Sequence, residues 1–122
     1  MRTLVLKAAS AYTEQALRIL RSGGLVAFPT DTVYGVGALA FDSGAVERLY
    51  WAKERPAEKA IPLLLGSAGD LRVVAQDIQE MATRLAERFW PGPLTLVVHK
   101  APDVPQSVAG GSTVGVRTYR PL

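Results

Sequence analysis

The chain has 122 residues, of which 48% are hydrophobic and 20% are charged, so it is long enough for one compact domain and too apolar to be disordered. It contains no cysteine and one histidine, which excludes disulfide frameworks, thiol nucleophiles and zinc sites built from these residues. The net charge of +3 favours anionic partners such as nucleotide phosphates or RNA, without identifying one.

No segment predicts export or membrane insertion. The amino-terminal segment has only a short apolar run before Lys7, unlike the core of a signal peptide. No stretch approaches the roughly 20 apolar residues that a membrane-spanning helix needs. We therefore expect a soluble, cytoplasmic protein with no membrane partner and a single domain over residues 1–122.

The first predicted elements are short. The apolar run at 3–6 predicts a strand, and Ser10 lies where a helix N-cap would be. Apolar residues at helical spacing follow, and the glycine pair at 23–24 can end that helix. The run at 25–28 is too short for a helix and predicts a buried strand. Residues 29–37 are predicted as loop or strand with glycine breaks.

The second half of the chain alternates between helical and extended patterns. Helical spacing from Ser43 predicts a second helix, which Pro56 prevents from continuing. Residues 78–89 form an amphipathic helical pattern that Pro-Gly-Pro ends. Three apolar runs predict further strands, at 61–65, 94–98 and 113–116. This order, without internal repeats, indicates a mixed α/β fold.

The segment FPTDTVYGVG, residues 28–37, places three hydroxyl side chains and a carboxylate directly after a predicted buried strand. Such a turn can present polar groups to a small ligand, and Gly35 and Gly37 would let backbone approach it closely. A purely structural turn has the same signature. The segment is neither a Walker A loop nor a complete dinucleotide fingerprint.

A second motif, KERP, places three cations within seven residues near a predicted helix end: Lys53, Arg55 and Lys59. A lysine point charge and a planar arginine fork together suit a polyphosphate. The alternative is a solvated helix end whose cations complement the helix dipole.

Two further motifs follow, FWPGPLT at 89–95 and TVGVR at 113–117. We expect Trp90 to belong to the core, although it could stack on a base. Thr113, Gly115 and Arg117 alternate with valines and should face one side of a strand. An arginine on a ligand-binding face is a natural carboxylate clamp, while exposed strand arginines are common. His99 has no carboxylate pattern around it and is not expected to be catalytic.

Taken in this order, PTDTVYGVG, KERP, FWPGPLT and TVGVR resemble the YrdC-like family of threonylcarbamoyl-AMP synthases, over about Ala16 to Arg117. The resemblance implies an open, twisted α/β domain with a concave, positively charged face. It also implies a reaction of L-threonine, bicarbonate and ATP, with Mg²⁺, to give threonylcarbamoyl-AMP and pyrophosphate. A partner enzyme would load the product onto the tRNA adenosine beside the anticodon.

The resemblance also implies roles for individual residues. Thr32 would contact the substrate threonine, Tyr34 would line the same pocket, and Arg117 would bind the threonine carboxylate. The ATP phosphates would be bound by Lys53, Arg55 and Lys59, while Thr113 would face the nucleotide. No residue is implied as a covalent catalyst, since such chemistry depends on positioning and charge stabilisation.

The sequence departs from the family after the TVGVR strand. Members usually continue with Val-Pro and His-Pro turns and then a Ser-x-Asn segment, whereas here the residues are 118–122, TYRPL. We therefore expect the chain to correspond to the front part of such an enzyme, to bind ligands weakly and to be a poor catalyst. Exposed sheet edges would also favour association into homo-oligomers.

Two other functions stay open at this point. The basic composition also fits a non-catalytic RNA-binding module of the same fold, which would bind RNA in a salt-dependent manner without ATP. Exposed aromatic residues for base stacking are sparse, however. A related carbamoyl-transfer domain of a hydrogenase-maturation protein shares the motifs, but would be expected to follow acylphosphatase and zinc-finger segments.

Overall fold

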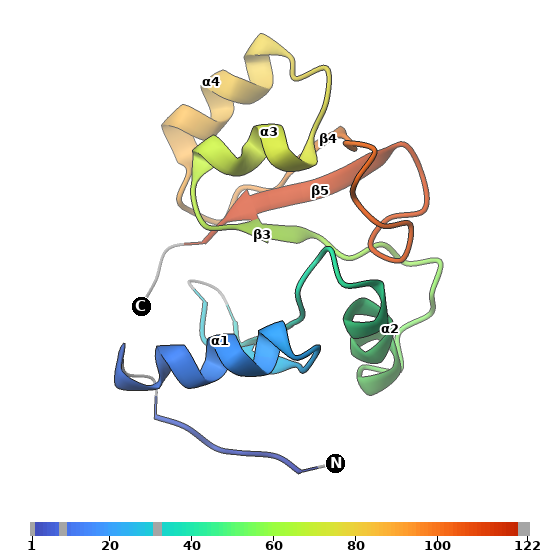
Figure 1. Ribbon diagram of the computed structural model, residues 1–122. Helices are drawn as coiled ribbons and strands as arrows, with labels where there is room; N and C mark the ends of the chain where they lie inside the picture. The colour runs from blue at the N-terminus through green and yellow to red at the C-terminus, as the bar shows by residue number, and fades with distance from the viewer. Residues whose placement is uncertain (1, 8–9, 31–32, 120–122) are drawn as a thin grey trace.

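The structure is a computed structural model that describes residues 2–7, 10–30 and 33–119, and Figure 1 shows its arrangement. Helices and strands are mixed along the chain, which confirms the predicted class. In chain order the elements are the 3-10 turn η1 (Ser10–Tyr12), α1 (Thr13–Arg21), β1 (Val26–Phe28), β2 (Gly35–Gly37), α2 (Ser43–Ala52), β3 (Leu63–Leu65), the 3-10 turn η2 (Ala68–Asp70), α3 (Leu71–Val74), α4 (Glu80–Phe89), β4 (Leu96–His99) and β5 (Thr113–Thr118).

A three-stranded sheet lies at the centre of the fold, in the order β3, β5, β4. The central strand β5 runs parallel to β3 and antiparallel to β4, with Val116 opposite both Leu63 and Leu96. Because side chains alternate along a strand, Val114 and Val116 point to the buried face and their neighbours to the other. The predicted strand at 113–116 is thus confirmed and extends to Thr118.

The core lies between this sheet and the helices α3 and α4, which cover one of its faces (Figure 1). Val116 and Val108 are almost completely buried there. Trp90 is 8% exposed and donates from Nε1 to the Leu94 carbonyl oxygen at 2.8 Å, so its predicted place in the core is confirmed. The Trp90–Pro91 peptide bond is cis.

A second, two-stranded sheet pairs β1 with β2 in antiparallel register, with Phe28 opposite Gly35. Helix α1 lies beside this hairpin, and α2 lies on the same side of the molecule (Figure 1). Within the described residues the strands are therefore divided between two open sheets.

The carboxyl-terminal end of α1 and the start of α2 follow the sequence signals, whereas the predicted N-cap at Ser10 is wrong, because Ser10 begins the 3-10 turn η1 and Tyr12 is the N-cap of α1. Gly23 adopts a φ of +87°, and its amide donates to the Leu20 carbonyl oxygen at 3.0 Å, which ends α1 at the predicted glycine pair. An added Cβ at Gly23 would lie 2.4 Å from Arg48 Nη2. At the start of α2, the Asp42 carboxylate accepts from the Ala45 amide at 3.1 Å.

The predicted strand at 3–6 is wrong. Residues 2–7 form no regular element, and Leu4 and Val5 are exposed. A strand needs a neighbour to satisfy its backbone, and no described strand pairs with this segment. No helix among the described residues has the length and apolar character needed to cross a membrane.

Candidate functional site

The predicted ligand residues of β5 lie on the sheet face opposite the core. Thr113, Gly115 and Arg117 alternate with buried residues, so the predicted common face is confirmed. Leu64 is paired with Arg117, and Val97 with Gly115, so these two apolar side chains flank the same face. Both are exposed, Val97 to 71%. This surface, defined by residues 64, 97, 113, 115 and 117, is called the open face below.

Gly115 keeps the open face accessible at its middle. A Cβ added there would lie 3.2 Å from Thr95 Cγ2 and 3.8 Å from Pro62 Cβ. The absence of a side chain therefore leaves room beside the backbone of β5 between these two neighbours.

The hydroxyl-rich segment approaches one end of β5. The rings of Phe28 and Tyr119 are 5.8 Å apart, and Tyr119 lies two residues beyond Arg117. Phe28 is opposite Gly35 in the hairpin, and the preceding residue, Tyr34, is 77% exposed. The hairpin end that carries Tyr34 is therefore close to the end of β5 that carries Arg117.

The centre of the hydroxyl-rich segment is only partly described. The Thr30 hydroxyl donates to the Val33 carbonyl oxygen. Thr32, the residue expected to contact threonine, lies outside the described residues, so its role stays a prediction.

The KERP segment forms a turn that side chains hold in place. Arg55 donates from Nη2 to the Ala60 carbonyl oxygen at 2.9 Å and from Nε to the Lys59 carbonyl oxygen at 3.3 Å. The Tyr50 hydroxyl also donates to the Lys59 carbonyl oxygen, at 2.7 Å. Arginine has five N–H donors, so these two bonds leave others for a ligand. Lys53, the C-cap of α2, and Lys59 are exposed.

This turn leads directly to the open face. Pro62, at the entrance to β3, is the residue that lies near the Gly115 backbone. The contacts thus bring the hairpin end to one end of β5, and Pro62, which follows the KERP turn, to its middle. They do not test the ligand role of any single residue, and those roles stay predictions.

Two titratable groups near these segments differ in environment. Burial raises the pKa of the Tyr50 phenol above its usual value, and the nearby Arg55 charge partly opposes this shift. The phenol is therefore a neutral hydrogen-bond donor at physiological pH. His99 is exposed and lies opposite Thr113 in the β4–β5 ladder, and within the described residues it forms no ion pair.

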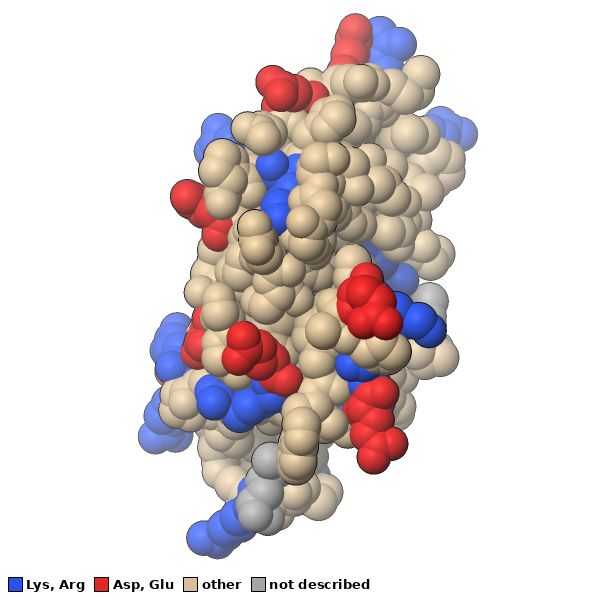
Figure 2. All heavy atoms as spheres, turned by 90° about the vertical axis from the view of Figure 1, so that its right-hand side faces the viewer, with Lys and Arg blue, Asp and Glu red and all other residues tan. Residues whose placement is uncertain are grey.

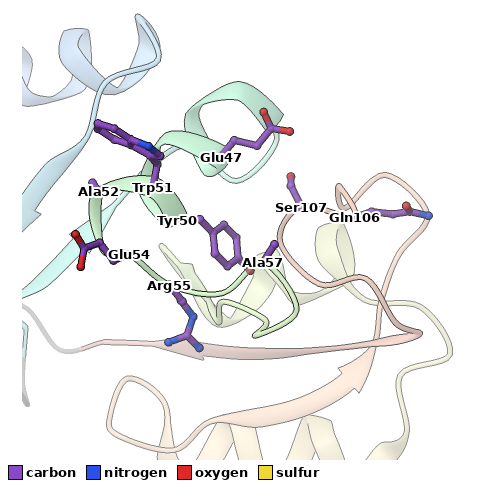
Figure 3. Close-up of a pocket in the computed structure, with 9 residues that line it drawn as sticks. All are labelled: Glu47, Tyr50, Trp51, Ala52, Glu54, Arg55, Ala57, Gln106 and Ser107. Carbon is purple, nitrogen blue, oxygen red and sulfur yellow. The ribbon is translucent and has the colours of Figure 1, made fainter.

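A separate pocket of about 870 Å³ lies between the carboxyl-terminal half of α2 and the loop that precedes β5 (Figure 3). Of the predicted site residues, Arg55 alone lines it. No sequence motif predicted this pocket. One signal was available, since Trp51 directly follows the apolar helical positions of α2 and is 79% exposed.

Charge is mixed on the face of the molecule that contains α2. Figure 2 shows basic and acidic side chains interspersed there. A single-sign patch, which a nucleic-acid backbone would favour, is not seen on this face.

Residues 18–120 match the family model Sua5_yciO_yrdC, described as Telomere recombination. The chain belongs to the Sua5/YciO/YrdC family. This result confirms the family that the four ordered motifs resemble.

Two curated relatives of this chain carry the same name. The threonylcarbamoyl-AMP synthase of Pyrococcus abyssi is 47% identical over 120 residues, which are 94% of this chain and 35% of that protein. The threonylcarbamoyl-AMP synthase of Bacillus subtilis is 41% identical over 105 residues, 84% of this chain and 30% of that protein. The chain therefore spans about a third of the length of these two relatives.

Solved structures agree with the family assignment. Pyrococcus abyssi Sua5 complexed with L-threonine matches with a TM-score of 0.88 and 45% identity, covering 95% of this chain and 34% of that one. Escherichia coli YciO matches with a TM-score of 0.80 and 25% identity, covering 93% of this chain and 56% of that one. The open-sheet α/β fold of the family is thus confirmed for this chain.

Proposed function

We propose that this chain contributes the threonine- and ATP-binding residues of a threonylcarbamoyl-AMP synthase, whose product serves tRNA threonylcarbamoyladenosine modification. The observation that carries the proposal is the likeness to a Sua5 structure complexed with L-threonine, over 95% of this chain. The placement of Tyr34, the KERP turn and Arg117 around the open face of β5 supports it.

The proposed reaction balances without a covalent protein intermediate. The threonine amine forms a C–N bond with the bicarbonate carbon and water is lost. A carboxylate oxygen of the resulting carbamate then attacks the α-phosphorus of ATP, and pyrophosphate leaves. Both steps gather negative charge at defined positions, so positioned cations and hydrogen-bond donors supply the catalysis.

In this proposal threonine and ATP bind to different residues of the site. Arg117 binds the threonine carboxylate as a planar clamp, with Thr32 and Tyr34 beside it. Lys53, Lys59 and the remaining donors of Arg55 bind the phosphates, and Thr113 faces the nucleotide. The half-buried position of Arg117 on the open face supports its assignment, because partial removal from water strengthens a charged hydrogen bond.

Magnesium is expected with ATP. Among residues 2–7, 10–30 and 33–119, no group of three or more histidine, aspartate or glutamate side chains could hold a metal ion. The proposal therefore assigns Mg²⁺ no protein ligand and places it with the phosphates, where this ion commonly binds. When bound, it would neutralise charge on the phosphate oxygens.

Calorimetry with L-threonine and with ATP plus magnesium tests the proposal. We expect saturable heats for both, with L-valine giving none, because valine is similar in size but lacks the hydroxyl. Arg117→Lys should weaken threonine binding roughly tenfold or more, because lysine cannot form the bidentate pair. ATP binding should change little in this variant.

Arg72→Lys is the matched control, since Arg72 is an exposed arginine of α3. It should bind both substrates as the parent chain does. Equal threonine affinity in the parent chain and Arg117→Lys would contradict the assignment of Arg117. RNA binding that falls steeply with salt, with no heat from threonine or ATP, would instead favour the non-catalytic RNA-binding alternative.

A further inference from the structure

The pocket beside α2 has two walls that are held in place by the fold. Figure 3 shows Tyr50 at its middle, with the other lining side chains arranged around it. One wall is α2, and the other is the loop before β5. The Val108 carbonyl oxygen fixes this loop by accepting from the Ile61 amide at 2.9 Å, and the Tyr50 hydroxyl oxygen, whose proton is donated to Lys59, lies 3.4 Å from it. The lining residues are Glu47, Tyr50, Trp51, Ala52, Glu54, Arg55, Ala57, Gln106 and Ser107.

Trp51 is the unusual member of this lining. Helix α2 buries Val46, Leu49 and Tyr50 in the core, while Trp51 is 79% exposed and does not contribute to the core. Leaving a large aromatic side chain in water forgoes about 1.5–3 kcal/mol of burial free energy. Tryptophan is also among the residues most enriched where proteins bind one another.

The charge of the pocket is opposite to that of the chain. Glu47 and Glu54 lie on either side of Trp51 around the rim (Figure 3), and within the described residues neither forms an ion pair. The single cation of the lining, Arg55, directs its guanidinium toward the Lys59 and Ala60 carbonyl oxygens. The rim is therefore acidic around an aromatic ring, in a chain of net charge +3.

We propose that this pocket docks a basic segment of another protein, with an arginine side chain stacked on Trp51 between Glu47 and Glu54. A guanidinium stacks on an indole face and pairs with carboxylates in one plane, which a lysine ammonium cannot do. Ser107 lines the wall of the pocket opposite α2. The pocket shares Arg55 with the proposed phosphate site, but the inference does not depend on the proposed function, since Glu47, Trp51 and Glu54 are not among the proposed ligand residues.

Intrinsic fluorescence provides the measurement, because Trp51 is exposed and Trp90 is buried. The full chain is titrated at low salt with a short, acetylated and amidated glycine-serine peptide that carries one central arginine. The same peptide with glutamine in place of arginine, and free agmatine, are titrated in parallel. Calorimetry measures binding for variants that lack the Trp51 signal.

The arginine peptide should bind saturably and change the Trp51 fluorescence. The double variant Glu47→Gln, Glu54→Gln should weaken binding roughly tenfold, and Trp51→Ala should abolish it, whereas Trp51→Phe retains part of it. Glu87→Gln, an exposed acid on α4, is the matched control and should bind as the parent chain does.

Three results would overturn the proposal. Equal affinity for the arginine and glutamine peptides would show that the arginine charge does not contribute to binding. Equal affinity for agmatine and the arginine peptide would make the pocket a small-cation site. Unchanged affinity in the double glutamine variant would show that the carboxylates of Glu47 and Glu54 do not contribute to binding. Thermal unfolding of each variant ensures that lost binding reflects the pocket, since all three substituted side chains are exposed.

Discussion

Single residues at the candidate site combine a structural role with a proposed ligand-binding role. Arg55 illustrates this, because its guanidinium holds the Lys59 and Ala60 carbonyl oxygens while it is also a predicted phosphate ligand. A residue that fixes its own turn presents its remaining donors in a defined direction. Substitution of Arg55 would therefore disturb both the turn and binding, which is why the tests above use Arg117 and not Arg55.

Gly115 gives a prediction at the same scale. We expect Gly115→Val to lower the free energy of unfolding by about 1–3 kcal/mol, because the new side chain would crowd Thr95 and Pro62. Chemical denaturation measures this change.

Gly111→Val is the matched control. A Cβ at Gly111 would meet nothing within 4 Å, so its free energy of unfolding should change by less than about 0.5 kcal/mol. Equal losses of unfolding free energy in Gly115→Val and Gly111→Val would show that Thr95 and Pro62 do not restrict the space beside Gly115.

At the scale of elements, the turn after α2 depends on one helix side chain. The Tyr50 hydroxyl reaches the Lys59 carbonyl oxygen at 2.7 Å and the Val108 carbonyl oxygen at 3.4 Å, so it ties α2 to the KERP turn and to the loop before β5. Glu54 adopts a φ of 51°, which shows how sharply the chain turns there. Helix α2 therefore stabilises the KERP turn and the loop before β5 through Tyr50.

The raised pKa of Tyr50 gives a pH-dependent prediction. Its folded-state pKa exceeds the unfolded value of 10.0, so its contribution to stability is fully present below pH 10 and is lost as the pH rises through the folded-state pKa. Tyr50→Phe should cost about 1 kcal/mol at neutral pH.

Urea denaturation between neutral pH and pH 11 measures the free energy of unfolding of the parent chain and of Tyr50→Phe. The parent chain should lose stability above pH 10 more steeply than Tyr50→Phe, so that the two curves converge. Parallel curves over the whole range would show that ionisation of Tyr50 does not oppose folding.

At the scale of the whole molecule, apolar surface on the sheet is left uncovered. Helices α3 and α4 cover one face of the three-stranded sheet, while Leu64 and Val97 are exposed on the other. Within the described residues β4 is also an edge strand, and although its His99 carbonyl oxygen accepts from the Gln76 amide at 2.9 Å, such an edge can pair with another chain. Both features favour the expected homo-oligomer.

We therefore predict association that rises with protein concentration and that Val97→Lys reduces, because a charge on an exposed edge strand opposes pairing. Sedimentation velocity measures it. Val73→Lys, at an exposed position on α3, should leave association unchanged. A chain that remains monomeric at all concentrations would contradict the prediction.

Features that depend only on neighbouring residues could be predicted before the fold was known. The start of α2 beside Asp42, the end of α1 at Gly23 and the two-residue alternation of β5 are local consequences of capping, glycine geometry and strand periodicity. The four motifs also carried the family assignment. The strand predicted at 3–6 was wrong because extended structure requires a partner that local sequence cannot supply.

Only the tertiary structure decided which distant segments meet. The pocket beside α2 arises because residues 106–107 pack near a helix that ends more than fifty residues earlier, and periodicity carries no information on such an approach. The same holds for the Phe28–Tyr119 contact, which brings the hairpin to the end of β5. Burial of apolar surface draws these segments together, and it acts on the whole chain at once.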